Sequence, residues 1–298
     1  MSRTRTRAFL YVSGVAVVVL AVAGLVARLL ASRVLGVEVT PDIQVRLPAD
    51  RLFTMVGVPV TNTMLSCWLA SLLLVAFFLA ARWRARRAPR GLQNVAEALL
   101  EALFDLVQGA AGAQRSRYLF PIAATFFLFI VANAWIALLP FYGPVVAVLK
   151  SGQHVPLLRG AGTDINMSVA LAVVAGVVVE GAGMATLGVG YFGRFVRVRS
   201  LLRGRFFLGT VELFTGLMDG FTELFRLLSF SLRLFGNLTA AEILLLVVGF
   251  LSPLILSVPF YGLELLIGAV QALVFAGLTV ALTIVATTPD RGDLLEGV

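Results

Sequence analysis

A charged side chain lies inside a long apolar stretch of this chain. Arg233 sits within residues 206–251, which are almost continuously apolar. Placing an arginine in the middle of a bilayer costs roughly 3 to more than 10 kcal/mol, and a guanidinium keeps its proton in proteins. Such a residue normally faces protein or a wet cavity, and it marks an ion pathway by default. The alternative is an arginine paired to a neighbouring carboxylate for structure alone.

Polar side chains recur at helical spacing on both sides of Arg233. Successive members are three or four residues apart, so they form one stripe along a helix. The stripe comprises Asp219, Glu223, Arg226, Phe230, Arg233 and Asn237. Charges confined to one stripe of a membrane helix predict a single wet or protein-facing side. Glu242 comes nine residues after Arg233, which is about half a turn out of phase at about 100° per residue, so it should face another helix.

The last apolar segment carries a second polar face. Glu264, Gly268 and Gln271 are three or four residues apart, and the glycine allows a neighbouring helix to pack closely between the two polar groups. An outer polar route is predicted from Asn237, Glu242, Glu264 and Gln271. An inner route, nearer the cytoplasm, would hold Asp219, Glu223 and Arg226. Arg233 lies where the two routes would meet.

The composition indicates an integral membrane protein. Of the 298 residues, 59% are hydrophobic and 13% are charged, whereas soluble domains carry about 25% charged residues. The mean hydropathy is +0.97. The net charge is +8, but most basic residues cluster beside apolar segments, so membrane topology explains them better than nucleic-acid binding. The single cysteine, Cys67, allows no internal disulfide.

Apolar segments long enough to cross a bilayer recur along the chain. The predicted spans are residues 8–27, 61–81, 118–141, 167–191, 206–251 and 258–287. The first predicts an uncleaved N-terminal anchor, although a signal peptide would have a similar pattern. Residues 31–60 contain three prolines and predict an external loop. We therefore expect an anchor and loop at residues 1–60 and a channel domain at residues 61–298.

Two segments need a special arrangement. Residues 206–251 would make a helix of about 69 Å, against a hydrocarbon core of about 30 Å. Because no proline interrupts this segment, we expect one steep, curved helix.

Residues 91–112 predict an amphipathic surface helix, whose apolar side is Leu92, Val95, Leu99, Leu103, Leu106 and Val107. Its other side carries Glu97, Glu101 and Asp105; contact with a basic partner and an ordinary solvated face are both consistent with this pattern.

The distribution of arginines predicts the orientation in the membrane. Arginine clusters at residues 82–90 and 194–205 fall on the same side as the N-terminal arginines, and the positive-inside rule places that side in the cytoplasm. Six spans then put both termini in the cytoplasm. The loop containing His154 would lie outside. Asp164 is placed to cap the helix that follows it. Glu180, inside the predicted span 167–191, receives no role.

The motif around Arg233 resembles a known family. The run SLRLFGN at residues 231–237, followed by small residues and Glu242, is similar to the signature of subunit a of the F-type ATP synthase. The resemblance extends over about residues 61–288 and includes Asp164 and Asn166. It implies an all-α membrane protein whose last two helices are long and steeply tilted beside a rotor ring. The implied location is a bacterial-type inner membrane.

The resemblance also implies a function. This subunit is the stationary proton channel of the complex: it gives two offset half-channels to carboxylates on the c-subunit ring and couples ion flow to rotation and ATP synthesis. The implied partners are the c ring, the peripheral-stalk b subunits, the whole F1Fo complex and the lipid bilayer, with no nucleic acid. The resemblance implies no catalytic site on this chain, no cofactor and no metal. Proton translocation would rest on Arg233, Asn237, Glu242, Glu264 and Gln271.

Some features depart from the family pattern, and two alternatives remain open. The residues before Arg226, among them Asp219 and Glu223, match the family pattern poorly. Glu264 stands where some relatives carry histidine, and the N-terminal anchor is additional. Sodium could be the coupling ion instead of the proton. An unrelated secondary ion transporter would also carry intramembrane charges, but it would usually show internal repeats, and we find none in the sequence.

Overall fold

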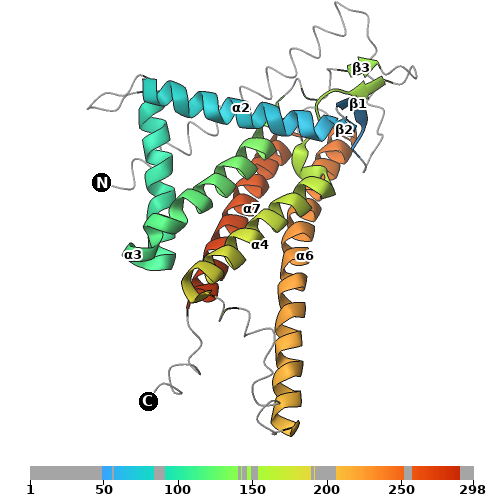
Figure 1. Ribbon diagram of the computed structural model, residues 1–298. Helices are drawn as coiled ribbons and strands as arrows, with labels where there is room; N and C mark the ends of the chain where they lie inside the picture. The colour runs from blue at the N-terminus through green and yellow to red at the C-terminus, as the bar shows by residue number, and fades with distance from the viewer. Residues whose placement is uncertain are drawn as a thin grey trace, which may run out of the picture. The chain divides into compact units, whose positions relative to one another are not determined.

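The computed structural model describes a helical protein with two short β-hairpins (Figure 1). It describes residues 49–55, 57–83, 91–139, 142, 146–148, 154–188, 191, 206–251 and 257–288. The predicted anchor at residues 8–27 and the basic cluster at residues 194–205 lie outside these ranges.

Five of the described helices are long and apolar enough to cross a membrane. They are α2 (Asn62–Trp83), α3 (Leu92–Ala137), α4 (Ile165–Leu187), α6 (Phe206–Leu251) and α7 (Ser257–Ala286). Each begins or ends within a few residues of a segment predicted from hydropathy. The prediction of an all-α membrane protein is therefore confirmed.

One hairpin comes just before α2, and the other lies between α3 and α4. Strand β1 (Arg51–Met55) pairs antiparallel with β2 (Val58–Thr61), and Gly57 in the turn adopts a φ of 82°. Strand β3 (Val146–Val148) pairs with β4 (His154–Pro156). The external loop predicted up to residue 60 contains the first hairpin, which was not predicted from the sequence. Pro59 argues against a strand except at the edge of a sheet, and a two-stranded hairpin consists only of edges.

Helix α3 contains the break that the sequence predicted between a surface helix and a span. Gly112 has a φ of 79° and a ψ of 163°, a backbone conformation that favours glycine. In the part before the break, the described chain covers only some of the predicted apolar residues. Leu103 and Val107 are buried, but the predicted apolar residues Leu92, Val95 and Leu106 are exposed. The rest of this chain covers only a narrow line of the helix, and the wider apolar face stays open.

Helix α6 runs without interruption over 46 residues, which confirms one continuous helix rather than two spans. Its C-terminal half is anchored within the chain by a narrow apolar line, made of Phe230, Leu234 and Leu238. Another side is exposed and apolar, with spacings that alternate between four and three residues: Phe207, Val211, Phe214, Met218, Phe221, Phe225, Leu228 and Leu232. Each residue of this second line has at least 39% of its surface exposed within the described chain. The tilt and curvature of α6 stay predictions.

The chain divides into two compact units, and α3, α6 and α7 each contribute to both. One unit contains the described parts of residues 1–93, 127–164 and 235–272, and the other contains those of residues 94–126, 165–234 and 273–298. Small residues allow close packing in each. In the first unit Gly162 lies against Leu238, and in the second Gly176 lies against Leu227.

Candidate functional site

Arg233 is an exposed residue in the middle of α6. Its Nη2 atom donates a long hydrogen bond of 3.4 Å to Oγ of Ser229, one helical turn earlier. Within the part of the chain that the structure describes, Arg233 forms no ion pair. A charge in a membrane-spanning helix is costly unless it is paired or hydrated. The alternative of an arginine paired within the chain for structure alone is therefore not supported by the described residues.

Two of the predicted outer residues are joined directly. Nδ2 of Asn237 on α6 donates a hydrogen bond of 2.7 Å to Oε1 of Gln271 on α7. Gln271 is almost fully buried, with 4% of its surface exposed, whereas Asn237 is exposed. Asn237 follows Arg233 by one turn of the same helix. The bond therefore ties a buried amide of α7 to the exposed side of α6 near the arginine.

The two predicted outer carboxylates also come together. Glu264 of α7 and Glu242 of α6 are close enough for their charges to interact, and both are partly buried. The Oε2 atom of Glu264 is buried and accepts no hydrogen bond from the described residues. That Glu242 faces another helix stays a prediction.

Close packing against α3 places the polar face of α7. A Cβ atom at Gly268 would lie 2.8 Å from Cβ of Ala134, so only glycine fits without a shift of the helices. Beside this contact, Nε1 of Trp135 donates a hydrogen bond of 3.0 Å to the backbone oxygen of Leu265. The prediction that Gly268 admits a neighbouring helix between two polar groups is confirmed. The neighbour is α3.

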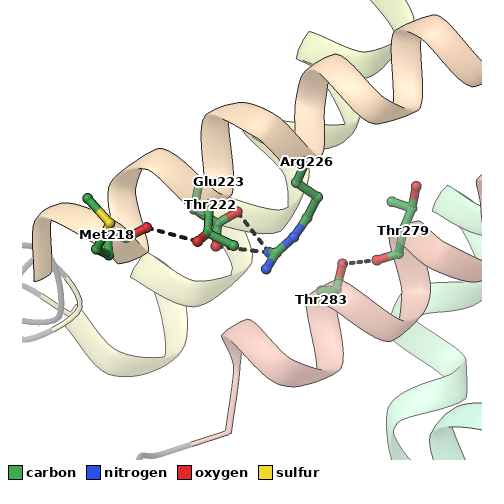
Figure 2. A network of polar contacts seen from close by, with 6 residues as sticks. All are labelled: Met218, Thr222, Glu223, Arg226, Thr279 and Thr283. Carbon is green, nitrogen blue, oxygen red and sulfur yellow. Dashed lines mark hydrogen bonds and ion pairs between the residues drawn. The ribbon is translucent and has the colours of Figure 1, made fainter. Parts of the chain in front are cut away.

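The predicted inner residues include an ion pair. Nη1 of Arg226 lies 2.9 Å from Oε1 and 2.8 Å from Oε2 of Glu223, one turn earlier on α6. Both side chains are partly exposed, at 29% and 24%. Asp219 lies one turn before Glu223 and is also partly buried. In Figure 2 the Arg226 side chain extends from α6 in the direction of α7.

The side chains of the polar stripe on α6 differ in burial within the described part of the chain. Asp219, Glu223 and Arg226 are partly buried, Phe230 is buried, and Arg233 and Asn237 are exposed. The spacing keeps these residues on one line of the helix.

Sequence reasoning missed a line of threonines on α7. Thr279 and Thr283 are buried, with 0% and 2% of their surfaces exposed. The Thr279 hydroxyl donates to the carbonyl oxygen of Phe275 at 2.8 Å. The Thr283 hydroxyl donates to that of Thr279 at 2.7 Å (Figure 2). Each hydroxyl oxygen can still accept a hydrogen bond. The spacing of four residues, repeated at Thr287, was the available signal.

A second polar cluster lies at the start of α2 and belongs to no predicted route. Oγ1 of Thr63 donates a hydrogen bond of 2.6 Å to Oδ2 of Asp164, the residue just before α4. The backbone of Asp164 is extended, with a φ of −107° and a ψ of 122°, as at a helix N-cap. Ser66 accepts a hydrogen bond of 3.1 Å from the backbone N–H of Arg159. The cluster joins the first hairpin, α2 and the segment before α4.

Comparisons with known proteins agree with the motif. The family model described as "ATP synthase A chain" matches residues 64–282. A protein named "ATP synthase subunit a" from Gloeobacter violaceus is 33% identical over 218 residues, which cover 73% of this chain and 80% of that protein. Proteins of the same name from Mycobacterium bovis and Mycobacterium tuberculosis are each 32% identical over 244 residues, covering 80% of this chain and 91% of theirs.

Proposed function

This chain belongs to the ATP synthase A chain family, and from that membership we propose that it is the stationary half of a rotary ion path. Subunit a is a non-catalytic proton-channel subunit of the Fo sector, it works in a complex with other ATP synthase subunits, and here it is a multi-pass bacterial membrane protein. Membership of this family explains the intramembrane charges, so the alternative of an unrelated transporter is not needed. The proposal concerns how the path is built.

The proposal rests on the exposure and the pairing of Arg233. Its guanidinium is exposed on a membrane-spanning helix and forms no ion pair within the described part of the chain. A permanent positive charge at this depth needs an acidic partner or water. A carboxylate on a neighbouring subunit would satisfy it. We therefore propose that Arg233 pairs with the ionised carboxylates of a c-subunit ring. Each carboxylate would pass Arg233 in turn.

The exposed apolar line of α6 supports a ring on that side. Leu228 and Leu232 are exposed beside Arg233, and Gly236 leaves open space where a side chain would be. A smooth apolar surface next to a single charge suits a partner that is apolar except for one carboxyl group per subunit. The acidic face of residues 92–111 is proposed to contact the peripheral-stalk b subunits.

The outer half-channel is assigned to the joined residues of α6 and α7. Asn237 and Gln271 share a hydrogen bond, and Glu242 and Glu264 form an acidic pair. Carboxyl groups can bind and release protons, while the amides can hold water by donating and accepting hydrogen bonds. Protons would enter here from outside and reach the ring carboxylate near Arg233.

The inner half-channel is assigned to Asp219, Glu223 and Arg226. Two of these residues form an ion pair, and the threonine oxygens of α7 provide further acceptors. A ring carboxyl group that has travelled through lipid in its neutral form would release its proton on this side. Arg233, being permanently charged, repels a proton that would pass directly between the routes. Each elementary charge that crosses 100 mV yields about 2.3 kcal/mol to drive rotation.

The coupling ion and the orientation are further parts of the proposal. We assign the proton rather than sodium, because the outer route carries two carboxyl groups and a hydrogen-bonded amide pair. We place both termini in the cytoplasm on the arginine distribution. In a Cys67→Ser background, an impermeant maleimide applied to intact cells should label Ser151→Cys and spare Ser200→Cys. The reverse pattern would contradict this orientation.

Replacement of Arg233 tests the central assignment. In the whole complex, Arg233→Ala should abolish ATP-driven proton pumping while the complex still assembles, since the ring carboxylate loses its partner. Arg233→Lys should restore little, because lysine is a compact charge that sheds its proton when desolvated. Ser229→Ala, which removes only the 3.4 Å hydrogen bond, is the matched control and should pump. Normal pumping by Arg233→Ala would remove the proposal.

A further inference from the structure

Three phenylalanines from three helices form a buried aromatic cluster. The ring of Phe275 on α7 lies 5.3 Å from that of Phe126 on α3 and 5.4 Å from that of Phe230 on α6, measured between centroids. Their exposed fractions are 2%, 6% and 5%, respectively. The ring plane of Phe275 is tilted by 60° from that of Phe126 and by 49° from that of Phe230. Aromatic rings at such distances attract each other beyond the effect of burial alone.

The cluster interrupts the polar residues of both helices. On α6, Phe230 comes one turn after Arg226 and two turns before Asn237. On α7, Phe275 comes one turn after Gln271 and one turn before Thr279. Along each helix, the aromatic residue therefore separates the side chains assigned to the outer half-channel from those on the inner side. The polar stripe of α6 contains only this one apolar member.

We propose that Phe126, Phe230 and Phe275 form an aromatic seal that prevents protons from passing along α6 and α7 without using the ring. This inference rests on the proposed function, because it concerns leakage between the two assigned routes. A buried water needs two to four polar partners, and three phenylalanine side chains offer none. A proton moving through a hydrogen-bonded chain of water would meet a gap at this level. Arg233 repels protons by its charge, whereas the seal excludes the water that would carry them.

The seal makes a prediction that differs from a packing role. Phe275→Ser places a hydroxyl group in the cluster and removes most of the ring volume. The space created would lie one turn from Gln271 and one turn from Thr279, so water entering it would find polar partners. The variant should conduct protons even when the ring cannot carry them. Phe275→Leu, which keeps an apolar group of similar bulk, should remain sealed.

The experiment uses the whole complex in proteoliposomes, with a ring whose proton-carrying carboxyl groups have been changed to amides. Passive proton flux is measured under an imposed potential. We expect at least about a tenfold higher flux for Phe275→Ser and Phe230→Ser than for the unaltered chain, which corresponds to a barrier lowered by about 1.4 kcal/mol. The matched control is Phe104→Ser, since Phe104 pairs with Phe120 at 5.3 Å in α3 but lies on no polar route. It should not leak.

The outcomes separate the seal from the proposed function. Assembled serine variants that conduct no more than the unaltered chain would overturn the seal, and so would an equal leak in Phe104→Ser. If the serine variants do not assemble, Phe275→Tyr replaces them in the test, because it keeps the ring and adds one hydroxyl group. A proton flux through Phe275→Tyr no higher than that through Phe275→Leu would again overturn the seal. High flux through the unaltered chain with the amide ring would instead contradict the proposed function, since protons would then not need the ring.

Discussion

Asn237 and Gln271 are bonded at 2.7 Å although they come from different helices and differ in burial. Gln271 is almost fully buried, and Asn237 opens to the surface of the chain. The pair thus connects the interior face of α7 with the side of α6 that carries Arg233. A polar contact of this kind fixes the rotation of α6 about its axis relative to α7, and that rotation decides where the arginine points.

The first prediction concerns this amide pair. Asn237→Leu should be more harmful than Asn237→Ser, because leucine leaves the buried Oε1 of Gln271 without a donor, at a cost of about 1–3 kcal/mol. We expect slower passive proton flux and weaker subunit retention for leucine. A double-mutant cycle with Gln271→Leu measures the coupling: the double variant should be less impaired than the sum of the singles. Strict additivity would show that the bond has no energetic role.

The second prediction concerns Glu264. If this carboxyl group takes up and passes on protons, Glu264→Gln should slow proton flux and change its dependence on external pH, with assembly intact. Glu264→His should retain more flux than glutamine, because histidine gains and loses a proton near neutral pH. The measurement is passive flux through membranes stripped of the catalytic head, over a range of external pH. Flux in Glu264→Gln equal to that of the unaltered chain at every pH would take this residue off the path.

The third prediction concerns the glycine contact between α7 and α3. Gly268→Ala should push the helices apart, because the new Cβ would lie 2.8 Å from Cβ of Ala134; overpacking of this kind costs about 1–3 kcal/mol. The hydrogen bond from Trp135 to the Leu265 carbonyl should weaken, which tryptophan fluorescence can report. Proton flux should fall, since Glu264 and Gln271 lie on the same helix.

Two variants control this test. Gly277→Ala adds the same methyl group to α7 where no described atom lies within 4 Å, so it should have little effect. Ala134→Gly in the Gly268→Ala background removes the opposing Cβ and should restore flux and fluorescence. If Gly277→Ala were as harmful as Gly268→Ala, the loss of a helical glycine rather than the contact would be responsible.

The fourth prediction concerns the ion pair of α6. Glu223→Gln leaves Arg226 charged and unpaired in a membrane helix, so ATP-driven pumping should fall. Arg226→Gln in the same chain should recover part of the loss, because the uncompensated charge is gone. If the double variant pumps no better than Glu223→Gln, the carboxyl group itself is needed on the inner route.

Some of the fold and the site was predictable from the chain alone because the signals are local. The continuous helix α6 follows from an apolar run without proline, and the shared face of Glu264, Gly268 and Gln271 follows from a spacing of three and four residues. The hairpin at β1 and β2 was not predictable. Its strands are short, contain Pro59 and gain stability from Asn62, whose side chain donates to the Pro156 carbonyl 94 residues away.

By itself the sequence determined which segments are apolar enough to span a bilayer, where Arg233 lies within them and which residues share a helical face. These properties depend on composition and on the fixed period of a helix. Only the tertiary structure decided which faces meet. Asn237 bonds to Gln271, Gly268 packs against Ala134, and three phenylalanines form one cluster. Such contacts depend on the rotation and depth of each helix against its neighbours, and side-chain packing over the whole bundle sets both.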